Sequence, residues 1–260
     1  MQAMSTAASL RNGRTRVGNL RYERIFFSGM AAFILLSVFV GFAQSYYLQR
    51  VPKFPHWKAF NSPPYPFIVH LHGVFFSAWV LLLITQTSLV AARRMAIHRR
   101  LGIAGFVLAC LLVLVGLMVV CEAMARHVPL GHRSIGSQAE AIFNTVGFAL
   151  LTYLGFRKRH DPAAHKRLMV LATIALLPAA FSRWPVFHDG THLRAAVCCF
   201  ALLVLIASYD FWSFAKVHSA TLLGGLTLVL TNPPVVWIFT HNSLWFRLAS
   251  LMQTAGRHLY

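Results

Sequence analysis

The chain has 260 residues, of which 57% are hydrophobic and only 12% carry a charge. A soluble domain of this length cannot hide so much apolar surface, so the composition excludes an ordinary soluble protein and predicts one that is dissolved in lipid. The net charge of +18 is not gathered into a basic patch with interleaved aromatic residues. We therefore expect no nucleic-acid partner.

Seven apolar segments are predicted to cross the membrane as helices. The fifth is short, but Asp161-Pro162 before it is typical of a helix start, with an N-cap followed by a first-turn proline, so this helix is expected to begin earlier. The fold class is therefore all-α, a seven-transmembrane helical bundle built from one anchor helix and three helical hairpins. The segments are 25–47, 67–91, 101–121, 139–156, 168–183, 192–213 and 221–240.

Basic residues occur mainly in alternate loops, which predicts how the bundle is oriented. If the N-terminus lies in the cytoplasm, fifteen of the 24 Lys and Arg residues fall on the inner side, as the positive-inside rule requires. The topology is then N-in/C-out, and the basic loops contact anionic lipid of the inner leaflet. We expect a disordered basic cytoplasmic tail over 1–20, a membrane domain over 21–240 and an outer interfacial segment over 241–260.

Three outgoing helices are predicted to begin with a histidine at the cytoplasmic end: His98, His165 and His218. Imidazole is the commonest protein ligand for metals and haem, and ionisable groups at one depth of a membrane protein suggest a functional site. Three converging histidines would hold a transition metal, or two of them would clamp haem b. The haem propionates would be neutralised by Arg99, Arg100 and Arg167. The carboxylate of Asp210 would ligate the metal, orient a ligand histidine or pair with an arginine. The alternative is that the basic histidine motifs only anchor the helix ends at the interface.

A second group of histidines lies on the predicted outer side, where it forms a candidate metal site. His70 and His72 are two residues apart, so on a helix they diverge by about 200° and only one points squarely into the bundle. The other two, His188 and His192, have a metal-like spacing of four, although Asp189-Gly190 between them favours a turn.

The last predicted span is interrupted near its middle by Thr231-Asn232-Pro233-Pro234. Two prolines remove backbone donors and Asn232 brings an amide to hydrocarbon depth, which is tolerated where the chain faces protein or a water-filled cavity. Asn232 and Pro233 are therefore predicted to line a pocket for a substrate or a quinone, with a simple proline kink as the alternative.

The segments His98–Gly102, Asp161–Met169, Val217–Leu222 and His70–Gly73 together resemble a group of bacterial polytopic membrane proteins without an assigned activity. The resemblance covers residues 65–240 and implies a helical bundle in a bacterial inner membrane. Histidines near both membrane faces are also similar in general arrangement to cytochrome b561-type proteins, whose layout implies electron transfer across the membrane.

These observations favour a membrane protein that binds haem or a metal through histidines, with electron exchange with a lipid quinone. One alternative is a membrane-embedded zinc hydrolase acting on lipid, similar to alkaline ceramidases in span number, although their late His-x-x-x-His motif is matched only by His188 and His192, on the wrong side. Another is a transporter or assembly protein without chemistry. The sequence leaves open whether the protein is an enzyme, and it does not predict an oligomeric state.

Overall fold

A computed structural model describes residues 2–48, 51, 65–125, 132–187 and 192–232, together with seven positions between 245 and 254. Side chains are described from residue 21 onward, except those of 132–137 and 192. Every regular element in these ranges is helical, which confirms the all-α prediction. The elements are α1 (Gln2–Phe42), η1 (Ala43–Tyr47), α2 (Phe67–Ala91), α3 (Met95–Ala125), α4 (His132–Arg157), α5 (Pro162–Leu176), α6 (Pro178–Phe181), α7 (His192–Phe214) and α8 (Ser219–Thr231).

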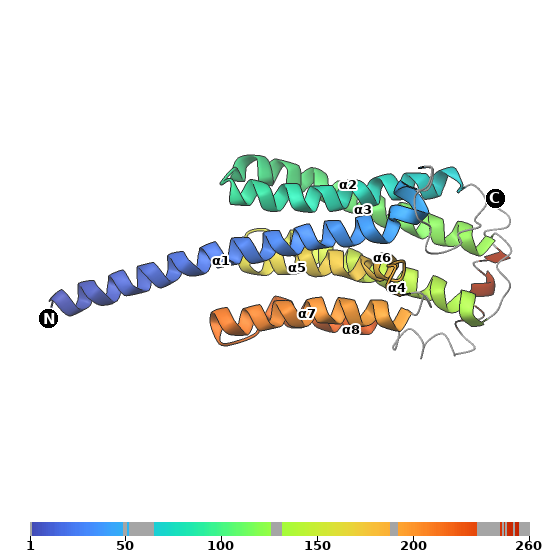
Figure 1. Cartoon of the computed structure of the whole chain (residues 1–260). Coiled ribbons are helices and arrows are strands. Elements are labelled where there is room, and N and C mark those ends of the chain that lie inside the picture. The colour runs from blue at the N-terminus through green and yellow to red at the C-terminus, as the bar shows by residue number, and fades with distance from the viewer. Residues whose placement is uncertain are drawn as a thin grey trace.

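Helix α1 differs from the sequence prediction at its start. The segment 1–20 was expected to be disordered, yet α1 begins at Gln2 and continues without a break into the first apolar segment. Residues 2–20 contain no proline and include several good helix formers, alanine, leucine, methionine and arginine among them, so the helix can extend from the anchored part into this segment. Figure 1 shows this part of α1 extending beyond the other helices.

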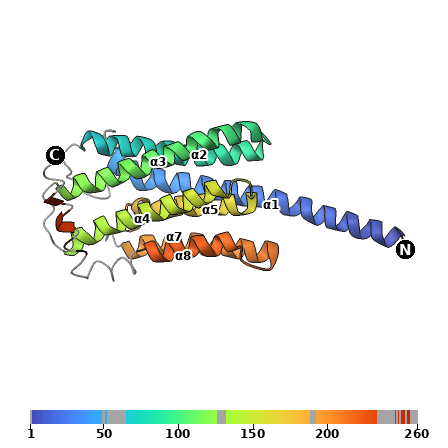
Figure 2. The ribbon, with the colours of Figure 1, turned by 180° about the vertical axis from the view of Figure 1, so that it is seen from behind.

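Six of the helices form three pairs, each closed by a short turn. The turns are 92–94 between α2 and α3, 158–161 between α4 and α5, and 215–218 between α7 and α8. Arg93 and Ala215 close two of them with φ values of 60° and 53°, in the left-handed region. Figures 1 and 2 show that the three turns lie at the same end of the bundle, the end from which the N-terminal part of α1 extends. The three predicted hairpins are therefore present.

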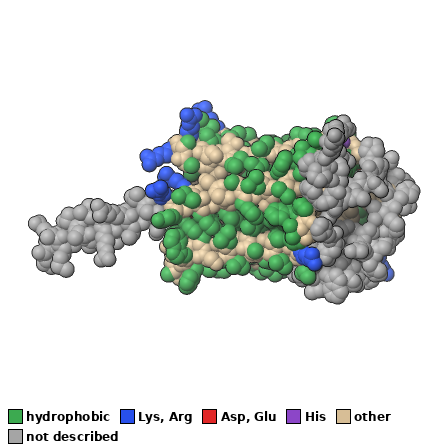
Figure 3. Space-filling view, in the orientation of Figure 1, with side chains coloured by type: hydrophobic (Ala, Val, Ile, Leu, Met, Phe, Trp, Pro, Cys, Tyr) green, Lys and Arg blue, Asp and Glu red, His purple; other side chains and the backbone are tan. Residues whose placement is uncertain are grey.

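The outer surface of the bundle is suited to lipid. In Figure 3 apolar side chains cover the middle of the visible face, and Lys and Arg side chains stand mainly at the end that carries the turns. Within the described residues, five helices are long and apolar enough to cross a membrane. They lie in Arg21–Tyr47, Phe67–Ala91, Met95–Ala125, Gln138–Arg157 and Leu193–Phe214.

The two remaining predicted spans contain shorter helices among the residues that the structure describes. Helix α5 begins at Pro162, and the Asp161 side chain accepts hydrogen bonds from the backbone of Ala163 and Ala164, as expected for an N-cap. It ends at Leu176 because Pro178, inside the predicted span, has no backbone N–H to continue the helix. Helix α8 ends at Thr231, and its 13 residues rise about 20 Å, less than the bilayer core of about 30 Å.

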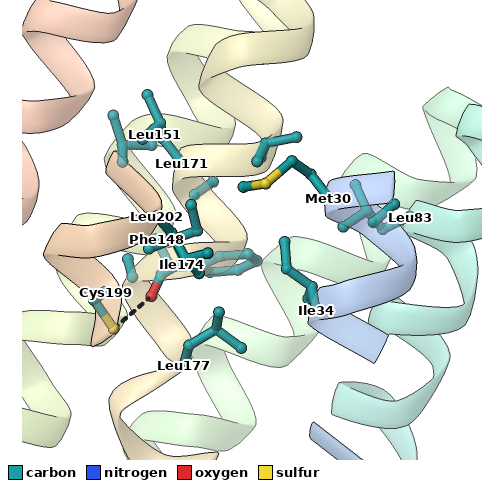
Figure 4. Close-up of a cluster of buried hydrophobic side chains, with 14 of the residues drawn as sticks. Met30, Ile34, Leu83, Phe148, Leu151, Leu171, Ile174, Leu177, Cys199 and Leu202 are labelled. Carbon is teal, nitrogen blue, oxygen red and sulfur yellow. Dashed lines mark hydrogen bonds between the residues drawn. The ribbon is translucent and has the colours of Figure 1, made fainter. Parts of the chain in front are cut away.

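The core lies between α1, α2, α4, α5 and α7. Figure 4 shows Ile34, Phe148, Ile174 and Leu177 among the side chains that fill it. Helix α5 is at the centre of the core. Its seven consecutive residues from Val170 to Leu176 are all buried or packed against this cluster, and Leu171 and Ile174 have no exposed surface. Helix α5 is thus surrounded by protein, whereas much of α3 faces outward.

Part of the predicted outer segment 241–260 is described. The described positions, which include Trp245 and Ala249, are helical. Trp245 packs against a small cluster formed by Val120, Met124 and the buried Ala249. The contact of Trp245 and Ala249 with α3 places these two residues at the end of the bundle opposite the turns.

Candidate functional site: a histidine pair at the turn end of the bundle

Two of the three predicted inner histidines meet. His98 lies in the first turns of α3 and His165 in the first turn of α5, so two separate hairpins deliver them. Their ring centroids are 6.3 Å apart and the ring planes are nearly perpendicular, at 83°. Both side chains are half-buried. Two separate hairpins therefore bring these two rings to one place.

The hydrogen bond of His165 defines which of its nitrogens is free. Nδ1 lies 2.8 Å from the backbone oxygen of Gly155, on the other helix of the same hairpin. A carbonyl oxygen can only accept, so Nδ1 carries the hydrogen and donates it. The lone pair of the neutral ring is then on Nε2, where a metal would bind.

His98 has the same arrangement with the nitrogens exchanged. Its ring is hydrogen-bonded to the backbone of Gln86 on α2, whereas its Nδ1 is buried and has no hydrogen-bond partner. The donated hydrogen therefore belongs to Nε2, and the unpaired Nδ1 carries the lone pair. A buried polar atom without a partner is unfavourable unless something absent from the protein chain pairs with it.

The side chain of Gln86 adds an oxygen to the same place. Its Oε1 is also buried without a partner, and its Nε2 lies 3.6 Å from the point where a Cβ at Gly102 would stand, one turn beyond His98 on α3. Gln86 also contacts the His98 ring through its backbone, so α2 and α3 each carry one unpaired atom beside the same contact. The sequence signal for Gln86 is an amide between two threonines in an apolar run.

His218 takes a different role. It is the N-cap of α8, and its Nδ1 accepts a hydrogen bond of 3.1 Å from the backbone N–H of Ala220. Its own backbone N–H donates to Asp210 Oδ2 at 3.1 Å. Burial lowers the pKa of His218 from its ordinary value of 6.5, and the nearby charge of Arg167 lowers it further. The neutral imidazole that accepts from Ala220 is thus the favoured form.

Asp210 pairs with an arginine, which is one of the three roles predicted for it. Arg167 donates to Asp210 Oδ1 through Nε at 2.8 Å and through Nη2, and its Nη1 donates to the oxygen of Ala163. Thr221 donates to Asp210 Oδ2 at 2.5 Å. Both charged side chains have no exposed surface. The pair links α5, α7 and α8, and Arg167 is engaged by the fold, whereas Arg99 and Arg100 are exposed beside His98.

The outer histidines separate as their spacing predicts. His70 is exposed, and its Nδ1 lies 3.4 Å from the hydroxyl of Tyr46. His72 points toward α3, where a Cβ at Gly116 would lie 3.5 Å from its ring, and its Nδ1 is buried without a partner. The other half of the predicted outer metal site lies outside the described residues, because neither His188 nor the side chain of His192 is described.

Asn232 marks the end of α8. It is 1% exposed, and its Nδ2 donates to the oxygen of Leu228 at 2.7 Å, while its Oδ1 has no partner. The break predicted at this position is therefore confirmed up to Asn232. The second predicted pocket residue, Pro233, lies outside the described residues.

Within the part of the chain that the structure describes, no three His, Cys, Asp or Glu side chains are grouped so that they could hold a metal ion. The three inner histidines therefore do not form one site, and the cluster reduces to the His98–His165 pair. No family model, curated protein or solved structure matches the chain.

Proposed function

We propose that the chain is a multi-pass membrane protein that binds haem b or a transition-metal ion between His98 and His165. The observation that carries the proposal is the pattern of ring nitrogens: each imidazole donates one N–H to a backbone carbonyl and keeps a lone pair on the other nitrogen. Histidines that ligate metals characteristically donate their second ring N–H in this way, which fixes the tautomer and the ring orientation.

The spacing of the two rings supports the same assignment. A ligating nitrogen lies about 2 Å from its metal and about 1 Å from its ring centre, so two imidazoles that hold one ion would have centroids up to roughly 6 Å apart. The pair has 6.3 Å. The buried, unpaired Nδ1 of His98 gives a further reason for a bound group, because coordination would satisfy it.

The number of ligands distinguishes the possible bound groups. If haem b is the bound group, His98 and His165 would hold it through its iron, and the exposed Arg99 and Arg100 beside the pair suit its propionates. A single transition-metal ion would use Gln86 Oε1 and solvent as further ligands beside the two histidines. When bound, haem iron or a redox-active ion such as copper would supply one-electron redox chemistry, and the protein would contribute the two histidines and the basic surface beside them.

We also propose that the protein sits in a bacterial inner membrane and exchanges electrons with a lipid quinone. The exchange belongs near the histidine pair rather than at Asn232, because α8 rises about 20 Å between the turn end and Asn232. The pocket predicted at Asn232 therefore needs a separate explanation.

The two alternatives predict different contents of the purified protein. A zinc hydrolase needs three protein ligands and an open position, and the described residues offer two histidines at this place. A transporter or assembly protein needs no cofactor at all. Pigment and metal content therefore separate the three functions before any substrate is known.

The experiment is purification of the full chain in mild detergent, followed by absorption spectroscopy and elemental analysis. We expect a Soret band, or iron or copper in a one-to-one ratio, and loss of that signal in His98→Ala and in His165→Ala. His70→Ala is the matched control, because His70 is an exposed histidine at the opposite end, and this variant should keep the signal. A folded, colourless and metal-free protein would refute the proposal, and so would zinc at full occupancy that both inner variants retain.

A further inference from the structure

A second group of unpaired polar atoms lies away from the histidine pair, where α8 stops inside the bundle. Asn232 caps the last turn through Nδ2, and its Oδ1 is buried with no partner. The next two residues in the sequence are Pro233 and Pro234. The Val229 carbonyl accepts from the backbone N–H of Asn232 at 3.4 Å. Because proline has no N–H, the Leu230 carbonyl cannot receive the usual helical hydrogen bond from Pro234.

Helix α4 brings another unpaired oxygen to the same level. Asn144 is 8% exposed and its Oδ1 has no hydrogen-bond partner. Helices α4 and α8 run in opposite directions (Figures 1 and 2) and touch at Gly147, where a Cβ would stand 3.1 Å from the Thr231 hydroxyl oxygen. Asn144 is one turn outward of Gly147, and Asn232 is the next residue outward of Thr231. Both amides therefore lie on the same side of one helix contact.

The chemistry of this place favours a positively charged ligand. Two amide oxygens are acceptors, and the C-terminal end of a helix carries partial negative charge. Helix ends inside a membrane, with unwound carbonyls next to them, are a recurrent way of coordinating sodium ions.

We propose that Asn144, Asn232 and the C-terminal end of α8 form a binding site for a monovalent cation of the size of Na⁺. This site is independent of the His98–His165 pair and would exist in a protein that binds neither haem nor metal. It accounts for two buried amide oxygens that the proposed redox function leaves unused. Buried water is the competing occupant of such a place, and it would give no dependence on the cation.

The test is the thermal unfolding of the purified full chain at constant ionic strength, with NaCl replaced stepwise by choline chloride. A ligand that binds only the folded protein raises the unfolding temperature in a saturable manner. We expect such a rise with Na⁺. Replacing one ligand oxygen, in Asn144→Leu, should weaken the apparent affinity for Na⁺ by about tenfold or more. Asn144→Asp keeps the oxygen and adds a charge, so it should bind Na⁺ more tightly than the wild type.

Thr152→Val is the matched control. Thr152 is on the same helix, is buried, and also has an unpaired oxygen, but it lies two turns inward of the proposed site. Its removal should leave the Na⁺ response unchanged. An unfolding temperature that is the same in Na⁺ and choline overturns the proposal. So does a Na⁺ response that survives in Asn144→Leu. Should Asn144→Leu fail to fold, an unaltered Na⁺ affinity in Asn144→Asp overturns it.

Discussion

Arg167 and Asp210 are fully buried, and each supplies the opposite charge and the hydrogen-bond partner that the other requires. Two charges without exposed surface are tolerated only when they are paired and hydrogen-bonded, and here Thr221 and the backbone of His218 complete the shell of the carboxylate. The aspartate belongs to α7 and its partners to α5 and α8. One carboxylate thus fixes the positions of three helices at the turn end of the bundle.

Removing one partner of this pair should be much more harmful than removing both. We expect Asp210→Ala to lower the free energy of unfolding by about 3–5 kcal/mol, because Arg167 is left as an uncompensated buried charge. The double variant Arg167→Met with Asp210→Leu should be close to the wild type. Chemical unfolding of the detergent-solubilised variants measures both, and a double variant that is less stable than Asp210→Ala would contradict the assignment.

His218 should make the stability depend on pH. Its pKa in the folded protein is lowered, first by burial and then by Arg167, with Lys166 acting in the same direction and Asp210 and Asp161 opposing. The unfolded chain therefore takes up the proton first as the pH falls. Stability should be constant with respect to this group above its ordinary pKa of 6.5, and it should fall as the pH drops from there through the lowered value.

The variant His218→Asn isolates this contribution. Asparagine is a good N-cap that does not titrate in this range, so the variant should lose the part of the pH dependence that His218 supplies. Unfolding temperatures measured from pH 8 to pH 5 in both proteins give the difference. Identical profiles in the two proteins would show that the cap does not titrate with folding.

At this scale the sequence was informative about residue type and depth but not about partners. The three histidines were predicted from one pattern, basic and apolar, yet His98 and His165 meet while His218 caps a helix. The difference arises because the backbone oxygens of Gly155 and Gln86 accept hydrogen bonds from the His165 and His98 rings. Nothing in the sequence around Gly155 or Gln86 indicates that either residue contacts a histidine. Only a three-dimensional arrangement of hairpins determines such contacts.

The elements show where local rules determine the structure. The start of α5 at Asp161-Pro162 and the end of α8 before Pro233 were predictable, because caps and prolines act on the backbone nearby. The early end of α5 at Pro178 was missed, although the same rule applies there. Apolar composition favoured a continuous span of 168–183 and outweighed the single proline.

The contact between α1 and α6 can be tested at a glycine. A methyl group at Gly41 would collide with the backbone carbonyl of Ala180, which cannot move as a side chain could. We expect Gly41→Ala to destabilise the protein by about 1–3 kcal/mol. Gly29→Ala on the same helix is the control, since nothing lies within 4 Å of its Cβ position; it should be stabilising by up to about 1 kcal/mol. Equal effects of the two substitutions on the unfolding temperature would contradict the close packing.

For the whole molecule, composition predicted a lipid-embedded helical bundle, and the described residues contain five helices suited to span a membrane. The number of seven spans rested on two further segments. Pro178 interrupts the first, and in the second the described helix ends at Thr231. The orientation in the membrane stays a prediction from the basic residues, supported by their position at one end of the visible face (Figure 3).

Labelling of single cysteines tests that orientation. In a variant without native cysteines, Arg94→Cys and Lys216→Cys lie in turns that we expect in the cytoplasm, so an impermeant maleimide should label them only after the membrane is opened. Tyr65→Cys, which precedes α2 at the opposite end, should be labelled in intact cells. The reverse pattern would place the N-terminus outside.

The central claim is that His98 and His165 bind one metal centre together. Pulsed electron paramagnetic resonance of the purified full chain measures this directly, on its own ferric or cupric centre or on metal-free protein loaded with one equivalent of Cu²⁺. The account predicts two coordinated imidazole nitrogens in the wild type and one in either His98→Ala or His165→Ala. A spectrum with two imidazole nitrogens that neither substitution changes, or with none in the wild type, would contradict it.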